Sequence, residues 1–106
     1  MQDLRTFLDL IRRERPHDVV DIGRTVNPRH ETTAILTKLE QSSRSPILLF
    51  RCVAGSPFPV VTNVCGSIGR LALALGCTVG GLSRVYAARC AQPVKPEVKS
   101  EAAVQE

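Results

Sequence analysis

Four cysteines are the residues most able to do chemistry in this chain of 106 residues, namely Cys52, Cys65, Cys77 and Cys90. A structural zinc site usually contains a closely spaced pair of cysteines, because a tight turn brings two thiolates to one ion, and no such pair occurs here. The N-terminus lacks the pattern of a secretion signal, so we expect a reducing compartment and no disulfide framework. We therefore interpret the cysteines as small, mostly buried apolar residues.

A second candidate is the segment Gly66-Ser67-Ile68-Gly69-Arg70, which lies between an expected strand and an expected helix. Backbone N–H groups at such a turn can hold a phosphate, and Arg70 could add a bidentate contact. The Walker and G-x-G-x-x-G patterns are both absent, and the G-x-x-G loop of a KH RNA-binding module would lie between two helices. We favour a structural role, in which Gly66 makes the turn and Ser67 caps the helix.

The two histidines and the carboxylates form no catalytic motif. His17 is expected in a turn and His30 in the first turn of a helix, and neither adjoins a cysteine or serine in a recognisable arrangement. Asp18 and Asp21 flank Val19-Val20, and they are interpreted as surface charges. The sequence therefore predicts no catalytic, cofactor-binding or metal-binding residue in this chain.

The composition is that of a small globular domain with one modest core. Fourteen basic and ten acidic side chains leave a net charge of +4, which permits an anionic partner without requiring one. No run of about 18 apolar residues is present to form a transmembrane helix. Single-stranded nucleic acid needs several exposed rings for stacking, and only Phe58 is expected to be exposed. We expect a cytoplasmic protein with no membrane or nucleic-acid partner.

The first part of the chain is predicted to form a helix and then a strand. A helix over about 4–15 follows the capping residue Asp3 and ends at Pro16. A strand over about 20–26 alternates in polarity, and Gly23 marks a bulge. The apolar stripe of the helix comprises Leu4, Phe7, Leu8 and Ile11.

The middle of the chain is predicted to form a helix and two strands. Asn27-Pro28 is typical of a helix start, and this helix extends to about Gln41. Consecutive apolar residues over 46–50 indicate a strand buried on both faces, in the centre of a sheet, which Arg51 interrupts. A third strand is expected over 60–65.

Two further helices complete the predicted domain. One covers about 68–75 and ends at Gly76 in the left-handed conformation. The other, over about 79–90, is capped by Thr78 and is expected to turn Leu82, Val85, Tyr86 and Cys90 inward. The order α-β-α-β-β-α-α indicates an α+β fold, with a small three-stranded sheet covered by about four helices. Residues 93–106, rich in proline and charge, predict an extended C-terminal tail.

Five blocks of sequence, taken in order, resemble the N-terminal region of the UbiD family of prenylated-FMN-dependent (de)carboxylases. They are Asp3-Leu4-Arg5-Thr6-Phe7-Leu8, Val26-Asn27-Pro28-Arg29-His30-Glu31, Pro46-Ile47-Leu48-Leu49-Phe50-Arg51-Cys52-Val53-Ala54-Gly55, Pro59-Val60-Val61-Thr62-Asn63-Val64-Cys65-Gly66-Ser67 and Arg70-Leu71-Ala72-Leu73-Ala74-Leu75-Gly76. Val104-Gln105-Glu106 also resembles the segment that precedes the family's cofactor-binding domain.

The resemblance implies decarboxylation of aromatic or α,β-unsaturated acids with prenylated FMN, Mn²⁺ and a monovalent cation. In that family the cofactor site, the metal ligands and the Glu–Arg–Glu catalytic set lie downstream of this region. The resemblance therefore divides the chain into a UbiD-like N-terminal α+β domain, 1–92, and a linker or tail, 93–106, that leads towards a cofactor domain. A chain of this kind alone is expected to bind no flavin and to catalyse nothing.

Three functions follow as hypotheses. The favoured one is an N-terminal module or small subunit of a UbiD-like decarboxylase, which scaffolds a partner cofactor domain or subunit within an oligomer. The second is a non-catalytic assembly protein that reuses the module to bind another chain. The third is a small basic nucleic-acid-binding domain, whose retention on nucleic acid would weaken steeply as salt rises.

Overall fold

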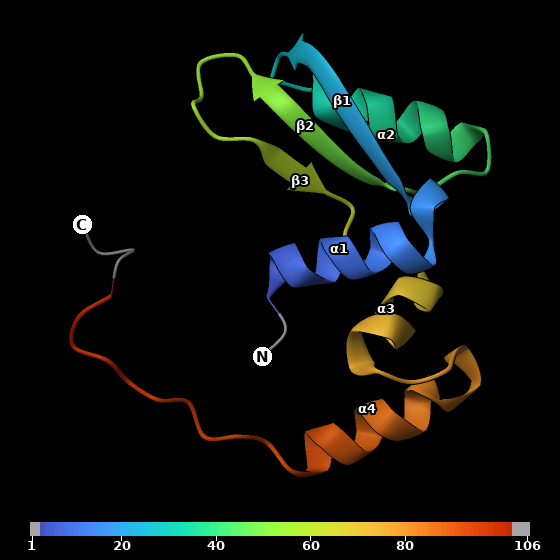
Figure 1. Cartoon of the computed structure of the whole chain (residues 1–106), viewed down its shortest axis with the longest axis vertical. Helices are drawn as coiled ribbons and strands as arrows, with labels where there is room; N and C mark the ends of the chain where they lie inside the picture. Colours follow the sequence, from blue (N-terminus) through green and yellow to red (C-terminus); the bar gives the residue numbers. More distant parts are fainter. Residues whose placement is uncertain (1–2, 103–106) are drawn as a thin grey trace.

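This computed structural model describes residues 3–102, which contain a three-stranded sheet and four α-helices (Figure 1). In chain order the elements are α1 (Leu4–Glu14), β1 (Val19–Val26), α2 (Glu31–Gln41), β2 (Ile47–Val53), β3 (Val60–Thr62), α3 (Ile68–Leu75) and α4 (Leu82–Ala91). Short 3₁₀ turns, η1 (Pro16–Asp18) and η2 (Val79–Gly81), precede β1 and α4. The α+β class and the order α-β-α-β-β-α-α predicted from the sequence are confirmed.

Strand β2 occupies the centre of the sheet, as its unbroken apolar run predicted. It pairs in parallel with β1, where Val20 faces Leu48, and antiparallel with β3, where Leu49 faces Val61. Parallel neighbours cannot be joined by a tight turn, so α2 provides the crossover between β1 and β2. The β1–β2 register shifts between Ile22 and Thr25, and the predicted bulge at Gly23 lies within this interval.

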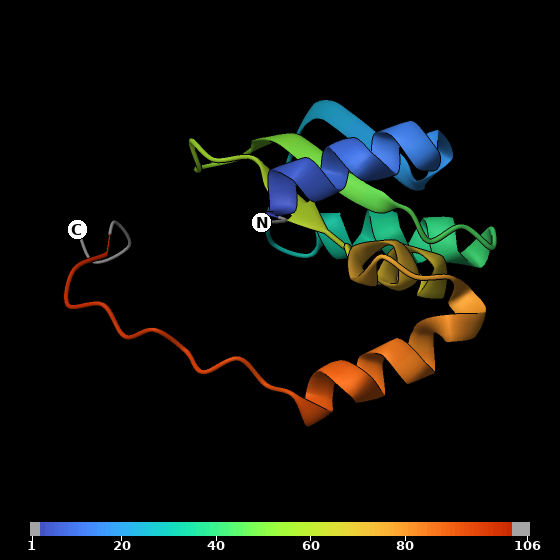
Figure 2. The ribbon, with the colours of Figure 1, turned by 60° about the horizontal axis from the view of Figure 1, so that its bottom comes forward.

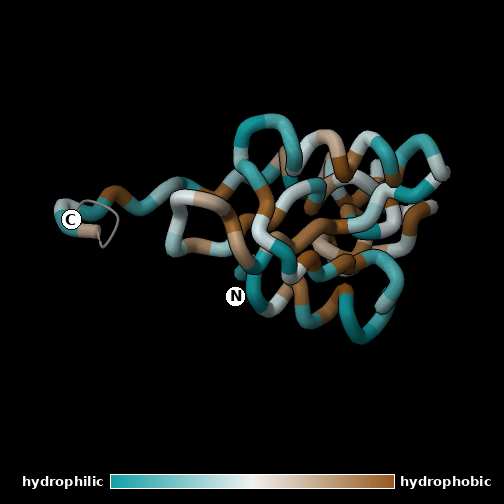
Figure 3. Tube along the Cα trace, turned by 90° about the horizontal axis from the view of Figure 1, so that it is seen from above, coloured by the Kyte–Doolittle hydropathy of each residue, from teal (hydrophilic) through white to brown (hydrophobic). Residues whose placement is uncertain are grey.

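Helices cover the two faces of the sheet and divide the core into two clusters. Figure 2 shows α1 and α2 on opposite sides of the strands. On the α2 side, Leu48 and Phe50 are buried against Leu36 and its neighbours on α2. On the α1 side, Ile47 is buried with Phe7 and Ile11, and residues of α3 pack against this cluster. In Figure 3 the apolar segments gather where the strands pass between the helices, and the C-terminal tail lies apart from them.

Helix α1 begins where its capping residue predicted. Asp3 Oδ1 accepts a hydrogen bond from the backbone N–H of Thr6 at 2.8 Å, and Thr6 Oγ1 accepts one from the N–H of Asp3 at 3.0 Å. These bonds satisfy N–H groups that have no partner inside the helix. The Thr6 N–H also lowers the pKa of Asp3, because it stabilises the ionised carboxylate.

Helix α2 begins at Glu31, so the start predicted at Asn27-Pro28 is wrong by three residues. The Asn27 side chain instead accepts a hydrogen bond from the N–H of Arg29 at 2.8 Å, and this closes a turn ahead of the helix. His30 then takes the left-handed conformation at φ 74°, which ends that turn. Glu31 stabilises the junction by accepting the N–H of Asn27 at 2.7 Å.

Removal of the Glu31 charge is expected to reduce the loss of stability in acid. The Asn27 N–H and the Arg24 guanidinium, 2.7 Å away, lower the pKa of Glu31 in the folded protein. A lowered folded pKa contributes stability that is complete above the ordinary pKa of glutamate and is lost as pH falls through the folded value. Glu31→Gln should therefore lose less stability than wild type between about pH 7 and about pH 2 in urea unfolding.

Glu40→Gln is the matched control, because Glu40 is exposed on the same helix and its side chain makes no hydrogen bond or ion pair within residues 3–102. It should retain the acid-dependent loss of the wild type. An equally steep loss in Glu31→Gln would show that the Glu31 contacts do not contribute to stability.

The strand boundaries differ from those predicted around β2 and β3. Strand β2 continues through Arg51 to Val53, because the Arg51 side chain extends into solvent and pairs with Asp21 on the neighbouring strand. Strand β3 has three residues instead of the six expected over 60–65. It ends because Asn63 adopts a positive φ of 60° and turns the chain towards α3.

The last helical segment starts later and packs less closely than predicted. Thr78 caps the 3₁₀ turn η2 by accepting the N–H of Gly81, and α4 begins at Leu82 because two glycines at 80–81 disfavour the α-helix. Leu82 and Val85 are half-buried, as expected. Tyr86 and Cys90 are exposed, so their predicted inward orientation is wrong.

The prediction that the cysteines are mostly buried is also wrong. Cys52, Cys65 and Cys90 are exposed, and Cys77 is half-buried. Each lies where the chain leaves its packed segments: near the end of β2, in the turn after β3, after α3, and on the outer part of α4. All four are free thiols.

The segment after α4 is extended as far as the structure describes it. Residues 93–102 contain no helix or strand, and Val94 and Val98 are each 92% exposed. The remainder of the predicted tail, including Val104-Gln105-Glu106, lies outside the described residues.

Candidate functional site

The candidate phosphate-binding segment is a structural junction built around a buried arginine, in keeping with the structural role favoured from the sequence. Arg70 is 1% exposed. Its guanidinium donates to the backbone oxygens of Ser45 (2.8 Å), Asn63 (3.0 Å) and Val64 (3.1 Å) and to Asp18 Oδ2 (3.4 Å). These bonds join α3 to the chain before β2, to the turn after β3 and to η1. The donors of Arg70 point into the protein, so the bidentate anion contact is not available.

Gly66 shows why this turn requires glycine. A Cβ at Gly66 would overlap the side chain of Asn63, whose Nδ2 donates to Ser45 Oγ and to the Pro46 oxygen, each at 2.9 Å. Ser67 occupies the N-cap position of α3, but its side chain makes no capping hydrogen bond. The favoured interpretation of the loop is therefore correct for Gly66. Ser67 stands at the predicted N-cap position of α3, but its side chain does not cap the helix.

The histidines and the two aspartates singled out in the sequence, Asp18 and Asp21, lie in η1, in β1 and in the turn before α2. His17 lies in η1 and His30 in the turn before α2, and both are exposed. Asp18 Oδ2 lies 2.9 Å from Arg15 Nε and also contacts Arg70. Asp21 Oδ1 lies 2.6 Å from an Arg51 nitrogen and 3.3 Å from Arg12. Within residues 3–102 no three His, Cys, Asp or Glu side chains are placed to hold one metal ion.

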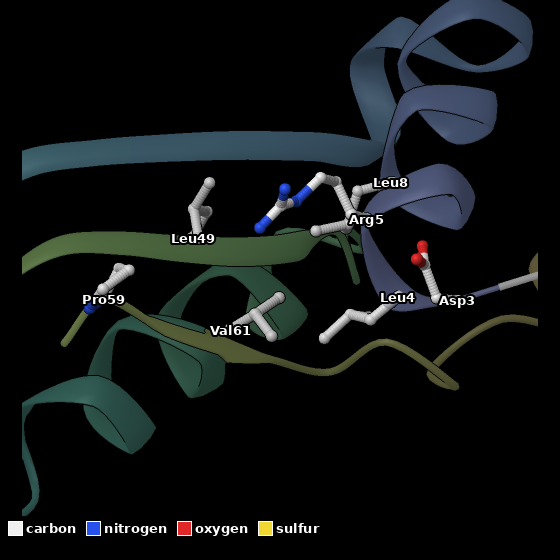
Figure 4. Close-up of a pocket in the computed structure, with 7 residues that line it drawn as sticks. All are labelled: Asp3, Leu4, Arg5, Leu8, Leu49, Pro59 and Val61. Carbon is white, nitrogen blue, oxygen red and sulfur yellow. The ribbon is translucent and has the colours of Figure 1, made fainter. Parts of the chain in front are cut away.

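An open groove lies where the N-terminal end of α1 meets the sheet, and we call it the α1–sheet groove (Figure 4). Its volume is about 590 Å³, and it is lined by Asp3, Leu4, Arg5, Leu8, Leu49, Pro59 and Val61. Figure 4 shows the Arg5 side chain reaching over the strands towards Leu49. The Arg5 side chain forms no hydrogen bond or ion pair with any described residue.

The α1–sheet groove has an apolar floor and one positively charged side chain, Arg5. This combination suits binding of another molecule better than catalysis. Its single carboxylate, Asp3, is held by the helix cap and has a lowered pKa, so it is a weak proton acceptor. Its lining contains no cysteine, serine or histidine. The sequence does not indicate this groove, because Leu4 and Leu8 match the apolar stripe of an ordinary helix that packs on a core.

A second groove lies between α3 and α4, and we call it the α3–α4 groove. It has a volume of about 430 Å³ and is lined by Leu71, Ala74, Leu75, Leu82, Ser83 and Tyr86. Tyr86 is 62% exposed, and no residue of α4 is fully buried. One hydrogen bond across the two helices joins Arg89 to the Leu75 oxygen at 2.9 Å.

Within residues 3–102 no single helix has the length and apolar character needed to cross a membrane. In the described part of the chain, α3 and the segment Val79–Ala91 meet both conditions when taken together, and these two are bent by 75° relative to each other.

Residues 10–90 match the model of the 3-octaprenyl-4-hydroxybenzoate carboxy-lyase N-terminal domain, UbiD_N. This match covers most of the chain, and the protein therefore belongs to the UbiD N-terminal domain family. It is also 38% identical over 73 residues to an uncharacterized protein of Chlamydia trachomatis and 36% identical over 74 residues to one of Synechocystis. The matches cover 69% and 70% of this chain but only 12% and 14% of those relatives, so the chain spans a small part of their length.

Two solved enzymes have the same fold over this region. An evolved dimeric form of the UbiD-class enzyme HmfF from Pelotomaculum thermopropionicum, in complex with prFMN, superposes with a TM-score of 0.72 at 28% identity. The match covers 90% of this chain and 21% of the HmfF chain. The vanillic acid decarboxylase of Sedimentibacter hydroxybenzoicus, in open form, superposes with a TM-score of 0.63 at 30% identity, over 74% of this chain and 17% of that one. The family suggested by the five sequence blocks is confirmed.

The described residues do not form a site that fits prFMN or a divalent metal. The volume of the α1–sheet groove is in the range of cofactor sites, roughly 300–1,000 Å³, so size alone does not exclude a cofactor. What the described residues lack is a set of converging side chains that could bind the cofactor or the metal. The one arginine aimed into the groove is Arg5, the Arg70 guanidinium is turned inward, and the acidic side chains are dispersed. The prediction that this chain supplies no site residue stays a prediction.

Proposed function

We propose that this chain is the N-terminal module of a UbiD-type decarboxylase and that it supports the cofactor-bearing part of the enzyme without supplying reacting groups. On this proposal 1–92 form the module, and 93–106 lead towards a cofactor domain. The observation that carries the proposal is the superposition of 90% of the chain on about a fifth of a prFMN-bound UbiD-class enzyme. The apolar groove between α3 and α4 supports it, because such a surface suits a protein partner.

The proposed reaction is decarboxylation of an aromatic or α,β-unsaturated carboxylic acid, in an oligomeric enzyme that uses prFMN with Mn²⁺ and a monovalent cation. When bound, prFMN supplies the electron sink for this chemistry. The part played by this chain is to cover and position neighbouring protein, through surfaces in which apolar side chains outnumber charged ones. The cytoplasm is the proposed compartment, in keeping with four free thiols.

Purification from the native cells under mild conditions tests this function. We expect the module to be recovered joined to, or in complex with, a UbiD-type polypeptide whose visible absorption spectrum is that of a flavin, and this material should release CO₂ from an aromatic acid such as vanillate. The 106-residue chain produced alone in cells that make prFMN should be colourless and should release no CO₂. A coloured or active isolated chain, or native material without a UbiD-type polypeptide, would contradict the proposal.

A further inference from the structure

The charges of this protein are unevenly distributed along the chain. Between Glu40 and Glu97 the sequence contains no aspartate or glutamate. The same interval contains the basic residues Arg44, Arg51, Arg70, Arg84, Arg89 and Lys95. Helices α3 and α4 both lie inside this interval, so the surface that they present combines apolar side chains with positive charge only.

Helix α4 is incompletely packed for a helix of its length. It has ten residues, and isolated helices shorter than about 12–15 residues are marginal in water. Its contacts with the rest of the protein run mainly through α3 and η2, and its lining residues Leu82 and Tyr86 leave the α3–α4 groove open. A third element laid into this groove would cover Tyr86 and complete the burial of Leu71 and Leu75.

Resting on the proposed function, we propose that the α3–α4 groove docks an amphipathic helix from the cofactor-bearing part of the enzyme, with apolar residues flanked by carboxylates. A concave space between two helices matches the ridge of apolar side chains along a third. Tyr86 supplies an aromatic anchor, which is the kind of residue that dominates binding energy at protein interfaces.

Charge complementarity selects the acidic partner. Arg89 is exposed on α4, and its guanidinium reaches the backbone oxygen of the lining residue Leu75 at 2.9 Å. It forms no ion pair with any described residue. A helix bearing Asp or Glu beside its apolar stripe would pair with Arg89, whereas a basic helix would be repelled.

Binding of two synthetic helical peptides to the uniformly ¹⁵N-labelled 106-residue chain tests this proposal. Both peptides carry leucines at helical spacing; one has glutamates beside the stripe and the other has lysines at the same positions. The glutamate peptide should shift the amide signals of the groove residues and should bind at least about 10-fold more tightly than the lysine peptide. Arg89→Glu should reverse this preference, whereas Arg84→Glu, on the opposite face of α4, should leave it unchanged.

Tyr86→Ser and Phe58→Ser form a matched pair of exposed aromatic substitutions, since Phe58 is 72% exposed on a loop that does not line the groove. Tyr86→Ser should weaken the glutamate peptide about 10-fold or more, and Phe58→Ser should change its affinity by less than about twofold. Equal binding of both peptides, shifts away from the groove, groove-mediated binding to phosphatidylglycerol vesicles, or dimerisation abolished by Tyr86→Ser would overturn the proposal. This test measures no cofactor or activity, so it can fail while the proposed function holds.

Discussion

Replacement of Arg70 by methionine is expected to lower the free energy of unfolding by about 3–5 kcal/mol. Methionine fills a similar volume but donates no hydrogen bond. The backbone oxygens of Ser45, Asn63 and Val64 would lose a buried donor, and Asp18 would lose its ion pair with Arg70. A loss of this size is a large part of the total stability of a small domain, about 5–15 kcal/mol. Guanidinium chloride unfolding followed by far-ultraviolet circular dichroism measures it.

Arg51→Met is the matched control for Arg70→Met, because it also removes a guanidinium that pairs with an aspartate. The Arg51 side chain is exposed, and exposed ion pairs contribute only about 0–1 kcal/mol. Similar losses in the two variants would contradict the interpretation that Arg70 acts through its buried hydrogen bonds. A folded Arg70→Met protein with unchanged stability would do so as well.

Replacement of Phe50 by alanine is expected to cost a further large amount, about 3–5 kcal/mol. Phe50 is fully buried at the centre of β2, in the cluster that joins the sheet to α2. Its removal would leave a cavity lined by aliphatic side chains such as Leu48, and that cavity could close only if the sheet moved towards the helix. Chemical unfolding gives the change in free energy, with the slope against denaturant checked for two-state behaviour.

Phe58→Ala provides the comparison, because this ring is removed from a loop where most of it contacts solvent. Its expected effect is within about 0.5 kcal/mol, as for most surface substitutions. If Phe50→Ala were equally mild, the α2 side of the sheet could not be the main core of the domain.

The sequence predicted the elements more accurately than their ends, and it predicted side chains in weakly packed segments least well. Consecutive apolar residues identified β2 as the central strand, and helical spacing of apolar residues placed Phe7 and Ile11 on the buried side of α1. The start of α2 was missed, because Asn27 can cap a helix or close a turn, and its bond with Arg29 decides between them only in three dimensions.

Packing partners explain the remaining differences. Cys90 and Tyr86 lie at helical spacing that is typical of a buried face, yet α4 has little protein to face within the described residues. The burial of Arg70 was not foreseen, because a sequence does not show that three backbone oxygens converge on its guanidinium. The order of five sequence blocks was sufficient to recognise the family. Neither groove could be predicted, because no short sequence motif marks it.

The two outer strands of the sheet have consequences for how the protein behaves in a crowded cell. An outer strand exposes N–H and C=O groups that can recruit a strand from another molecule and start aggregation. Strand β1 is interrupted by a bulge near Gly23, and β3 is three residues long and preceded by Pro59, which has no N–H to donate. Neither border offers a long flat template, so newly made copies should stay dispersed even at high local concentration.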